Sequence, residues 1–318
     1  MATPAHTWSR GEGMKLAHVI ESQQFTVPLL HELFARARQM EKVVARGGTL
    51  DYQDKIMATL FYEPSTRTRL SFEAAMLRLG GRVVSTEQAR LFSSEVEGEQ
   101  LEDTIRSLGG ICDCIVLRHG EAGGAKRAAK VSRVPVLNAG DGGGGQHPTQ
   151  ALLDLYTIWR ERGSLEGLSI AIVGELDRGR TARSLAYLLS KFERVRIFFV
   201  SPPEIGMQDD ILEHLEEHQV WTASESELGR VLGEVDVVYQ TRIRPERVAD
   251  RQSLARTVID GAMLAKMRAN AMILHPLPRT VEIDPAVDAD PRAFYFKQAE
   301  NGLYVRMALL TMVWEEAS

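Results

Sequence analysis

The sequence predicts two α/β domains of similar size, each built on a parallel β-sheet with helices on both faces. Short apolar runs alternate with longer amphipathic patterns along the chain, as strands and crossover helices do. A chain of 318 residues is too long for one small core and suits two domains. The polar segment RERGSLEGLS at 160–169 has four apolar runs before it and four after it. We therefore expect one domain over 1–160 and another over 161–300.

The predicted strands are the eight short apolar runs. They lie at 55–62, 82–87, 112–119, 134–139, 168–175, 194–201, 235–241 and 271–277. The predicted helices have apolar residues at three- and four-residue spacing and include 98–110, 147–163, 181–192 and 209–219. A final helical pattern follows the last strand, at 301–316.

Composition argues against several classes of protein. A net charge of −5 does not suit a protein that binds nucleic acid or an anionic membrane, so any positive site must be local. No apolar run approaches the roughly 18 residues that span a bilayer, and residues 1–15 contain no apolar core typical of a signal peptide. Cys112 and Cys114 are too close for an ordinary disulfide and too few for a structural zinc site. We expect two buried thiols, which fits a cytoplasmic location.

Basic and hydrogen-bonding residues recur where the predicted strands end. They are Ser65 to Arg69, Arg118 and His119, His147 and Gln150, Arg180, Arg242, and His275 to Arg279. In a parallel sheet the carboxyl ends of the strands share one edge, and ligands bind in the crevice there. Six separate segments are therefore expected to direct these groups at one region.

The segment STRTR, Ser65 to Arg69, opens a helical pattern. Ser65 or Thr66 suits the N-cap, and the first turn of a helix offers free N–H groups with a partial positive charge. Arg67 and Arg69 oppose that dipole unless an anion lies between them, so the segment predicts a phosphate site. A capped helix with solvated arginines is the alternative. No GxxxxGK[ST] pattern occurs, so this is not a nucleotide-binding P-loop.

Two further segments suit a ligand that carries a carbonyl and an amide. In GDGGGGQHPTQ, His147 and Gln150 are three residues apart and would share a helix face, where an imidazole can donate to a carbonyl and a carboxamide can hold an N–H₂ group. In HPLPR, the prolines flanking Leu277 limit backbone pairing and leave carbonyls free to accept from a ligand amide. A helix cap and a structural kink are the respective alternatives.

The motifs STRTR with SFE, HPTQALLDLYTI, GRT after a strand, TRIRPERV and HPLPR occur in an order that resembles the carbamoyltransferases. NAGDG and HPLPR make the chain most similar to aspartate carbamoyltransferase catalytic chains, from about Leu16 to the final helix. The resemblance implies two doubly wound parallel-sheet domains: a carbamoyl-phosphate-binding domain at 1–160 and an acceptor-binding domain at 161–300. It also implies that the last helix, 301–318, packs back on the first domain. It further implies a homotrimer with shared active sites and no metal or organic cofactor.

The resemblance also implies a role for each matched residue. Carbamoyl phosphate would be bound by Ser65, Thr66, Arg67, Thr68, Arg118, His147, Gln150 and the carbonyls of Pro276 and Leu277. Within this set Arg67, Thr68, Arg118 and His147 would be catalytic, because they face the charge that develops in the reaction. The carboxylates of an amino-acid acceptor would be gripped by Arg180 and Arg242.

Two positions depart from the family pattern. Glu97 stands where the family carries a lysine on a mobile loop that enters the neighbouring subunit's site, and Arg244 stands where a glutamine is usual. Arg244 could restore the positive charge that Glu97 removes, or the two residues could together bind a different acceptor. The loop could also stay outside the site. Three functions follow: carbamoyl transfer to L-aspartate for pyrimidine biosynthesis, transfer to another amino acid or amine, and binding of carbamoyl phosphate by a weakly active paralogue. Whether a regulatory chain binds is not decided by the sequence.

The substitution Glu97→Lys separates the explanations for the loop. If the loop enters the site, we expect a large rise in aspartate-dependent phosphate release, because two unit charges about 4 Å apart interact by roughly 4 kcal/mol at an effective dielectric near 20. Phosphate release measured for both proteins under the same conditions tests this. Unchanged activity would place the residue outside the site.

Overall fold

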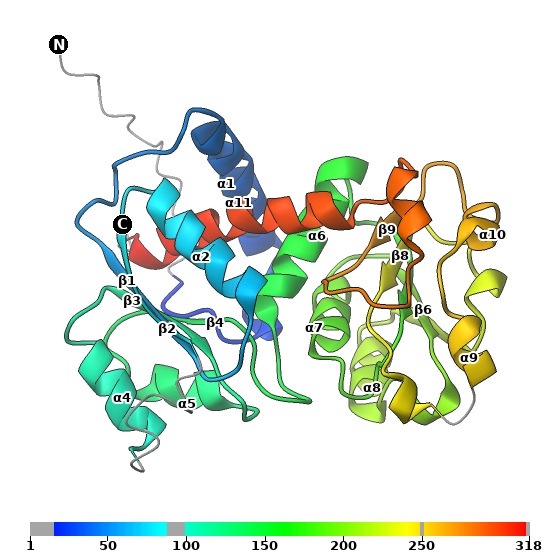
Figure 1. Cartoon of the computed structure of the whole chain (residues 1–318), viewed down its shortest axis with the longest axis horizontal. Helices are drawn as coiled ribbons and strands as arrows, with labels where there is room; N and C mark the ends of the chain where they lie inside the picture. The colour runs from blue at the N-terminus through cyan, green and yellow to red at the C-terminus, as the bar shows by residue number, and fades with distance from the viewer. Residues whose placement is uncertain (1–15, 88–98, 249–250, 316–318) are drawn as a thin grey trace.

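The computed structural model describes residues 16–87, 99–248 and 251–315. Two parallel β-sheets form separate lobes, with α6 and α11 running between them (Figure 1). The first sheet contains β1 (Ile56–Phe61), β2 (Arg82–Glu87), β3 (Cys114–Arg118) and β4 (Val136–Asn138) in the order β2-β1-β3-β4. The second contains β5 (Ser169–Val173), β6 (Arg196–Val200), β7 (Trp221–Glu225), β8 (Val237–Gln240) and β9 (Met272–Leu274) in the order β7-β6-β5-β8-β9. The predicted doubly wound fold is confirmed.

The helices cover both faces of each sheet. Those of the first half are α1 (Val27–Ala45), α2 (Thr66–Arg78), α4 (Leu101–Leu108), α5 (Gly124–Val131) and α6 (Pro148–Arg162). Those of the second half are α7 (Arg180–Leu189), α8 (Asp209–Glu217), α9 (Arg251–Ala255), α10 (Gly261–Leu264) and α11 (Tyr295–Trp314). Short 3₁₀ turns lie at Ser22–Gln24, Pro203–Ile205, Leu228–Arg230, Pro245–Arg247 and Pro285–Ala289.

Alternate residues of each central strand enter cores on opposite faces. In β1, Met57 and Phe61 join the core that contains α1, α2 and α11, whereas Ala58 and Leu60 join the core that contains α4 and α5. This two-residue alternation explains why these strands are apolar along their whole length. Cys114 lies in β3, and both cysteines are buried and free, as predicted.

The last helix returns to the first lobe. α11 contacts α1, α2 and α6, and it starts beside β9 of the second sheet. Most of its residues from Asn301 to Val313 are buried, so it is apolar on nearly all sides. The predicted packing of this helix on the first domain is confirmed, whereas the domain boundaries themselves stay a prediction.

The prediction of four strands in the second half was one too few. β7 forms an edge of the second sheet and pairs only with β6. None of its residues is buried, and the Trp221 side chain is exposed, so the sequence shows no apolar alternation there. Within the described part of the chain, no helix is long and apolar enough to cross a membrane.

Candidate active site

Each sheet has one switch point, where successive strands stop being added on one side of the first strand and start being added on the other. Several predicted site residues lie at or just after the ends of the strands that flank these points. In the first sheet the switch point lies between β1 and β3, and in the second it lies between β5 and β8. Crevices at such switch points are where doubly wound sheets bind ligands. Ser65, Arg180 and Arg242 lie in the segments after β1, β5 and β8, and Arg118 is the last residue of β3.

The start of α2 carries the residues predicted to bind a phosphate. Ser65 is the N-cap residue and makes no side-chain capping bond, and Thr68 is buried in the first turn. Thr66 and Arg67 are exposed, and Arg67 has no hydrogen-bond or ion-pair partner among the described residues. A free guanidinium beside the free N–H groups of a first turn is suited to a phosphate.

Arg69 has a different environment from Arg67. Its guanidinium contacts Glu73 at 3.3 Å, Ser85 Oγ at 3.0 Å and Glu87 at 3.1 Å. These contacts tie α2 to the edge strand β2. Arg69 therefore stabilises the fold, and Arg67 is the arginine of this segment that is left for a ligand.

Arg118, His147 and Arg180 converge on Gly140. A Cβ atom placed on Gly140 would lie 2.8 Å from Arg118 Nη1, 3.3 Å from His147 Cδ2 and 3.4 Å from Arg180 Cζ. Gly140 has a φ of +120°, which residues with a Cβ rarely adopt. The approach of three side chains to one glycine brings together groups from the end of β3, the N-cap of α6 and the start of α7. We call this cluster of side chains the pocket.

Glu63 partly balances the two arginines of this pocket. One of its oxygens, Oε2, lies 3.7 Å from Arg118 Nη2 and 3.7 Å from Arg180 Nη1. Arg118 also donates to the Ala139 carbonyl at 3.1 Å, and Arg180 donates to the Asp141 carbonyl. Arg180 therefore joins the second half of the chain to the first.

The two arginines are held in a poorly solvated environment. Burial, followed by repulsion from Arg180, lowers the pKa of Arg118 to about 10. Burial also lowers the pKa of Arg180. The Nε atom of Arg118 is buried and has no partner among the described residues. A bound anion would relieve both the repulsion and the unsatisfied donor.

His147 is a neutral imidazole in this pocket. It is the N-cap residue of α6, and its backbone N–H donates to Ser184 Oγ at 3.1 Å. Burial, together with Arg180 and Arg118, lowers the pKa of the ring well below its usual value of 6.5. Nδ1 lies 3.4 Å from the Thr149 hydroxyl. A neutral ring can donate one hydrogen bond to a carbonyl oxygen without adding a third charge.

Acceptors for an amide lie at the join between the two halves. Gln150 Nε2 donates to Asp154 Oδ1 at 2.7 Å, and no described donor occupies Gln150 Oε1. Leu277 has a φ of +54°, and its N–H donates to His275 Nδ1 at 2.7 Å. The carbonyls of Pro276 and Leu277 accept no hydrogen bond from the described residues. These three oxygens are therefore free to accept from an N–H₂ group, and the predicted site that they form stays a prediction.

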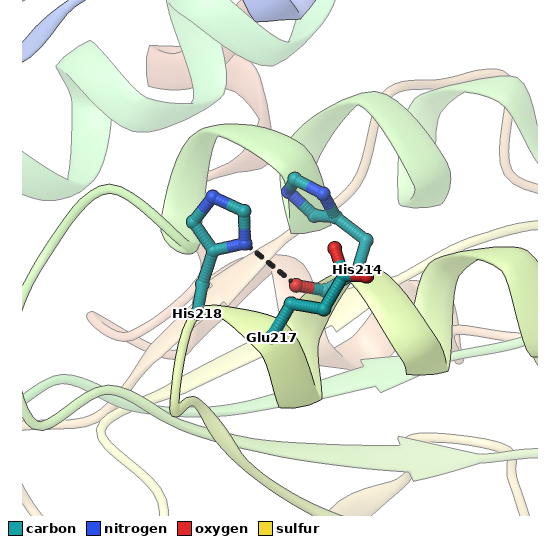
Figure 2. A group of neighbouring side chains, drawn as sticks. All are labelled: His214, Glu217 and His218. Atoms are coloured by element: carbon teal, nitrogen blue, oxygen red, sulfur yellow. Dashed lines mark hydrogen bonds between the residues drawn. The ribbon is translucent and has the colours of Figure 1, made fainter.

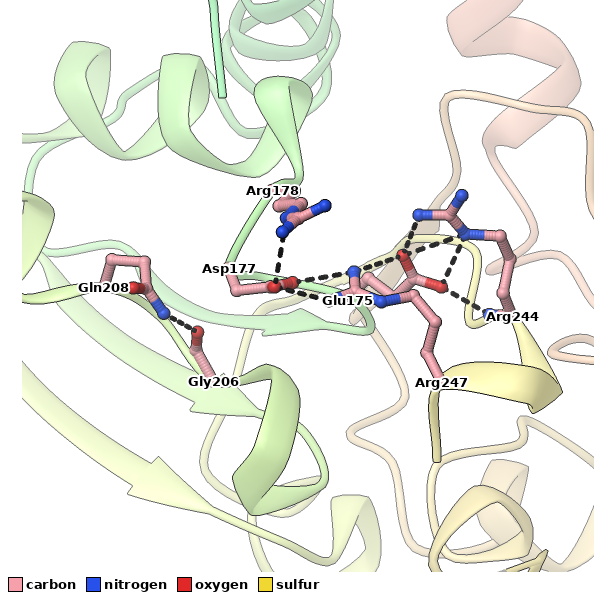
Figure 3. Close-up of polar contacts among 7 residues, drawn as sticks. All are labelled: Glu175, Asp177, Arg178, Gly206, Gln208, Arg244 and Arg247. Carbon is pink, nitrogen blue, oxygen red and sulfur yellow. Dashed lines mark hydrogen bonds and ion pairs between the residues drawn. The ribbon is translucent and has the colours of Figure 1, made fainter. Parts of the chain in front are cut away.

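Arg242 and Arg244 both lie in the segment after β8, but their side chains have different environments. Arg242 is exposed and has no side-chain partner among the described residues. Arg244 pairs with Glu175, at 2.8 Å between Nη2 and Oε2, and Figure 3 shows Arg247 joining the same carboxylate. Arg247 also pairs with Asp177 at 2.6 Å. Sequence reasoning missed these partners.

Glu63 and Glu175 follow the ends of β1 and β5, so the same strand-end rule that found the arginines could have found both. Glu97, the residue that departs most from the family pattern, lies outside the described residues.

One cluster of possible metal ligands occurs in the described part of the chain, and it lies away from this pocket. His214, Glu217 and His218 at the end of α8 have ligand atoms within 4.8 Å of one another (Figure 2). His214 Nε2 already pairs with Ser190 Oγ at 3.0 Å, and His218 Nδ1 pairs with the His214 carbonyl at 2.8 Å. Glu217 and His218 are exposed. Among the described residues, no hydrogen bond or ion pair joins these three side chains to Arg118, His147 or Arg180.

Two domain families account for almost the whole chain. Residues 17–160 match the carbamoyl-P binding domain of aspartate/ornithine carbamoyltransferase, and residues 166–313 match the Asp/Orn binding domain. The chain belongs to the aspartate/ornithine carbamoyltransferase family.

Named relatives come from distant organisms. "Aspartate carbamoyltransferase 2, chloroplastic" of Pisum sativum is 52% identical, over 97% of this chain and 81% of that protein. The aspartate carbamoyltransferase catalytic subunit of Methanopyrus kandleri is 46% identical, over 93% and 96%. Among solved structures, the Methanocaldococcus jannaschii catalytic subunit has a TM-score of 0.87 and 44% identity over 94% of this chain and 98% of that one. Aspartate transcarbamoylase of Trypanosoma cruzi in complex with carbamoyl phosphate and aspartate has a TM-score of 0.89 and 38% identity over 95% and 96%.

The neutral state of His147 makes the stability of the fold depend on pH. Because its pKa is lowered on folding, the unfolded chain binds a proton below pH 6.5 that the folded chain does not. Protonation of the unfolded chain should therefore lower the free energy of unfolding as the pH falls from 7.5 to 5.5, by on the order of 1 kcal/mol. In urea unfolding, the stability of His147→Gln relative to the unsubstituted protein should rise on acidification, because the variant lacks this proton-linked loss. Thr149→Val is a neighbouring change that adds no titratable group, so its free energy of unfolding should differ from that of the unsubstituted protein by the same amount at both pH values. An equal pH response of the two variants would contradict the assignment.

Proposed function

We propose that the protein transfers the carbamoyl group of carbamoyl phosphate to the amino group of L-aspartate, giving N-carbamoyl-L-aspartate and phosphate. The observation that carries the proposal is the convergence of Arg118, His147 and Arg180 at Gly140. The cluster brings together two cations and a neutral donor, from the end of β3, the start of α7 and the N-cap of α6. Relatives at 38% to 52% identity are named for aspartate, which favours this acceptor over a different amine.

Carbamoyl phosphate would lie across the first switch point. Ser65, Thr66, Arg67 and Thr68 would hold the phosphate at the start of α2. Arg118 would bridge the phosphate and the carbonyl oxygen. Gln150 Oε1 and the carbonyls of Pro276 and Leu277 would accept from the carbamoyl N–H₂, since no described group occupies them.

The reaction needs positive charge and hydrogen-bond donors at the carbonyl oxygen and at the leaving phosphate oxygen. The amine attacks the carbonyl carbon, negative charge grows on the carbonyl oxygen, and the bond to the phosphate oxygen then breaks with its electron pair. His147, Thr68 and Arg118 would donate to the growing charge, while Arg67 would stabilise the leaving phosphate. Each well-placed donor contributes on the order of 3 kcal/mol. We assign the proton lost by the amine to the departing phosphate, the strongest base that the reaction releases.

Aspartate would lie against the second switch point. Arg180 and Arg242 would bind its carboxylates, and holding both substrates together supplies a large further part of the acceleration. Arg244 would act at this side only when its pair with Glu175 opens. The roles of Glu97 and of a shared site in a homotrimer stay predictions from the family, as do pyrimidine biosynthesis and a cytoplasmic location.

A panel of amines tests the acceptor. Purified protein supplied with carbamoyl phosphate and with aspartate, ornithine, other amino acids or simple amines in turn should release phosphate fastest with aspartate. Phosphate release is measured against protein-free controls, because carbamoyl phosphate decomposes in water. A faster rate with another amine would identify a different acceptor. Stabilisation by carbamoyl phosphate without turnover would leave only the binding function.

Replacing Arg67 by alanine tests the phosphate site. Arg67→Ala should lower kcat by roughly 10²- to 10³-fold or more, because the leaving phosphate loses its main countercharge. Arg78→Ala is the matched control, since Arg78 lies in the last turn of the same helix and donates to the Gly47 carbonyl at 2.8 Å. The control should keep turnover near the starting value. Near-normal kcat in Arg67→Ala would refute the assigned role.

A further inference from the structure

A single buried carboxylate joins three elements behind the pocket. Asp154 is 0% exposed on α6. Its Oδ1 accepts from Gln150 Nε2 at 2.7 Å and from Gln298 Nε2 at 2.6 Å, while its Oδ2 accepts from the Tyr239 hydroxyl at 2.7 Å. The donors come from α6, α11 and β8, so the carboxylate sits where both halves of the chain meet.

Both amide donors lead to groups that we propose as acceptors for the carbamoyl N–H₂. Gln150 is itself one of the acceptors proposed for the carbamoyl N–H₂. Gln298 Oε1 accepts from the His275 backbone N–H at 2.8 Å, and His275 Nδ1 accepts from the Leu277 N–H at 2.7 Å. Asp154 Oδ1 is thus connected by hydrogen bonds to Gln150 on one side and to the Pro276–Leu277 backbone on the other.

Packing alone gives no reason for a carboxylate at this position. Burial raises the pKa of Asp154 to about 7, against the opposing effects of its three donors and of the charge of Arg306. Arg306 is a buried cation in the same region, but its guanidinium donates to Ser71 Oγ at 2.8 Å and lies 5.1 Å from the centroid of the Phe72 ring. A buried carboxylate without a direct cation is costly, and an apolar residue would often serve the fold as well.

We propose that Asp154 is a positioning residue for substrate selection: through Gln150 and Gln298 it sets the three oxygens that recognise the carbamoyl N–H₂ group. It thereby allows the site to distinguish carbamoyl phosphate from inorganic phosphate. The inference rests on the proposed function, because that function identifies the ligand. The phosphate itself is bound by groups at the start of α2, which have no hydrogen-bonded link to Asp154 in the described structure.

The chain contains a matched control one turn further along the same helices. Thr157 on α6 accepts from Asn301 Nδ2 on α11 at 3.0 Å, and both residues are 0% exposed. Thr157 is three residues after Asp154, and Asn301 is three residues after Gln298. This pair joins the same helices as the Asp154–Gln298 pair but does not contact the segment from His275 to Leu277. Its loss should loosen the helix contact without disturbing the amide acceptors.

The test compares two ligands in isothermal titration calorimetry at low temperature. Asp154→Leu keeps the approximate shape of the side chain and removes both oxygens. It should raise the Kd for carbamoyl phosphate about tenfold or more and change the Kd for inorganic phosphate by no more than about twofold. Asp154→Asn should largely restore carbamoyl phosphate binding, because its carbonyl can still accept from both amides while its N–H₂ donates to the Tyr239 oxygen. Thr157→Val should lower the melting temperature but change neither affinity by more than about twofold. In turnover, Asp154→Leu should raise KM for carbamoyl phosphate more than KM for aspartate.

The possible outcomes separate this inference from the proposed function. If Asp154→Leu still binds carbamoyl phosphate normally, or weakens both ligands equally, the inference is overturned and carbamoyl transfer stands. If the unsubstituted protein binds both ligands equally and transfers nothing, both proposals fail. Should Asp154→Leu not fold, Gln298→Met breaks the link to His275 and leaves two donors on Asp154. That variant should show the same selective loss for carbamoyl phosphate, and an unchanged preference would overturn the inference.

Discussion

The structure depends on an electrostatic constraint: the guanidinium groups of Arg118 and Arg180 are held side by side in a poorly solvated pocket, where Glu63 is the described carboxylate that pairs with both. Burial and mutual repulsion lower the pKa of Arg118, so the arrangement is costly until more negative charge arrives. The surrounding fold has to supply the rigidity that keeps these groups from separating. A preorganised positive pocket of this kind is what stabilises charge that develops during a reaction.

That rigidity comes from backbone topology. Phe61 pairs with Arg118 in the register of β1 and β3, so the turn into α2 and the Arg118 side chain leave adjacent strands at the same level. The second sheet presents Arg180 to the same pocket through a bond to the Asp141 carbonyl and an ion pair with Glu63. Because α6 and α11 run between the lobes, residues such as Asp154 can link the two halves through buried hydrogen bonds instead of surface contacts.

The sequence predicts the parts of this arrangement that depend on strand ends and helix starts. Apolar runs located every strand except β7, which is an exposed edge strand and needs no apolar alternation. The positions of Arg118, His147 and Arg180 followed from the rule that polar groups gather at the carboxyl edge of a parallel sheet. The ion-pair partners of the site arginines could not be predicted in this way. A contact such as that of Arg244 with Glu175 joins residues 69 positions apart and depends on how two loops pack. The same limit applies to Arg67 and Arg69, which look equivalent in sequence but differ in whether an acidic neighbour is within reach.

The contact between Arg244 and Glu175 bears on how this chain accommodates its departures from the family pattern. Glu175 accepts from the Arg244 backbone N–H at 2.6 Å as well as from its side chain, and its own backbone N–H donates to the Arg242 carbonyl at 3.3 Å. One acidic residue therefore holds the segment on both sides of Ile243, while the Arg242 side chain remains exposed. Since Glu175 balances the charge of Arg244, the structure does not favour the hypothesis that Arg244 replaces the positive charge missing at Glu97. It favours a division of labour in which Arg244 fixes the loop, and Arg242 and Arg180 provide the charge for the carboxylates of the acceptor.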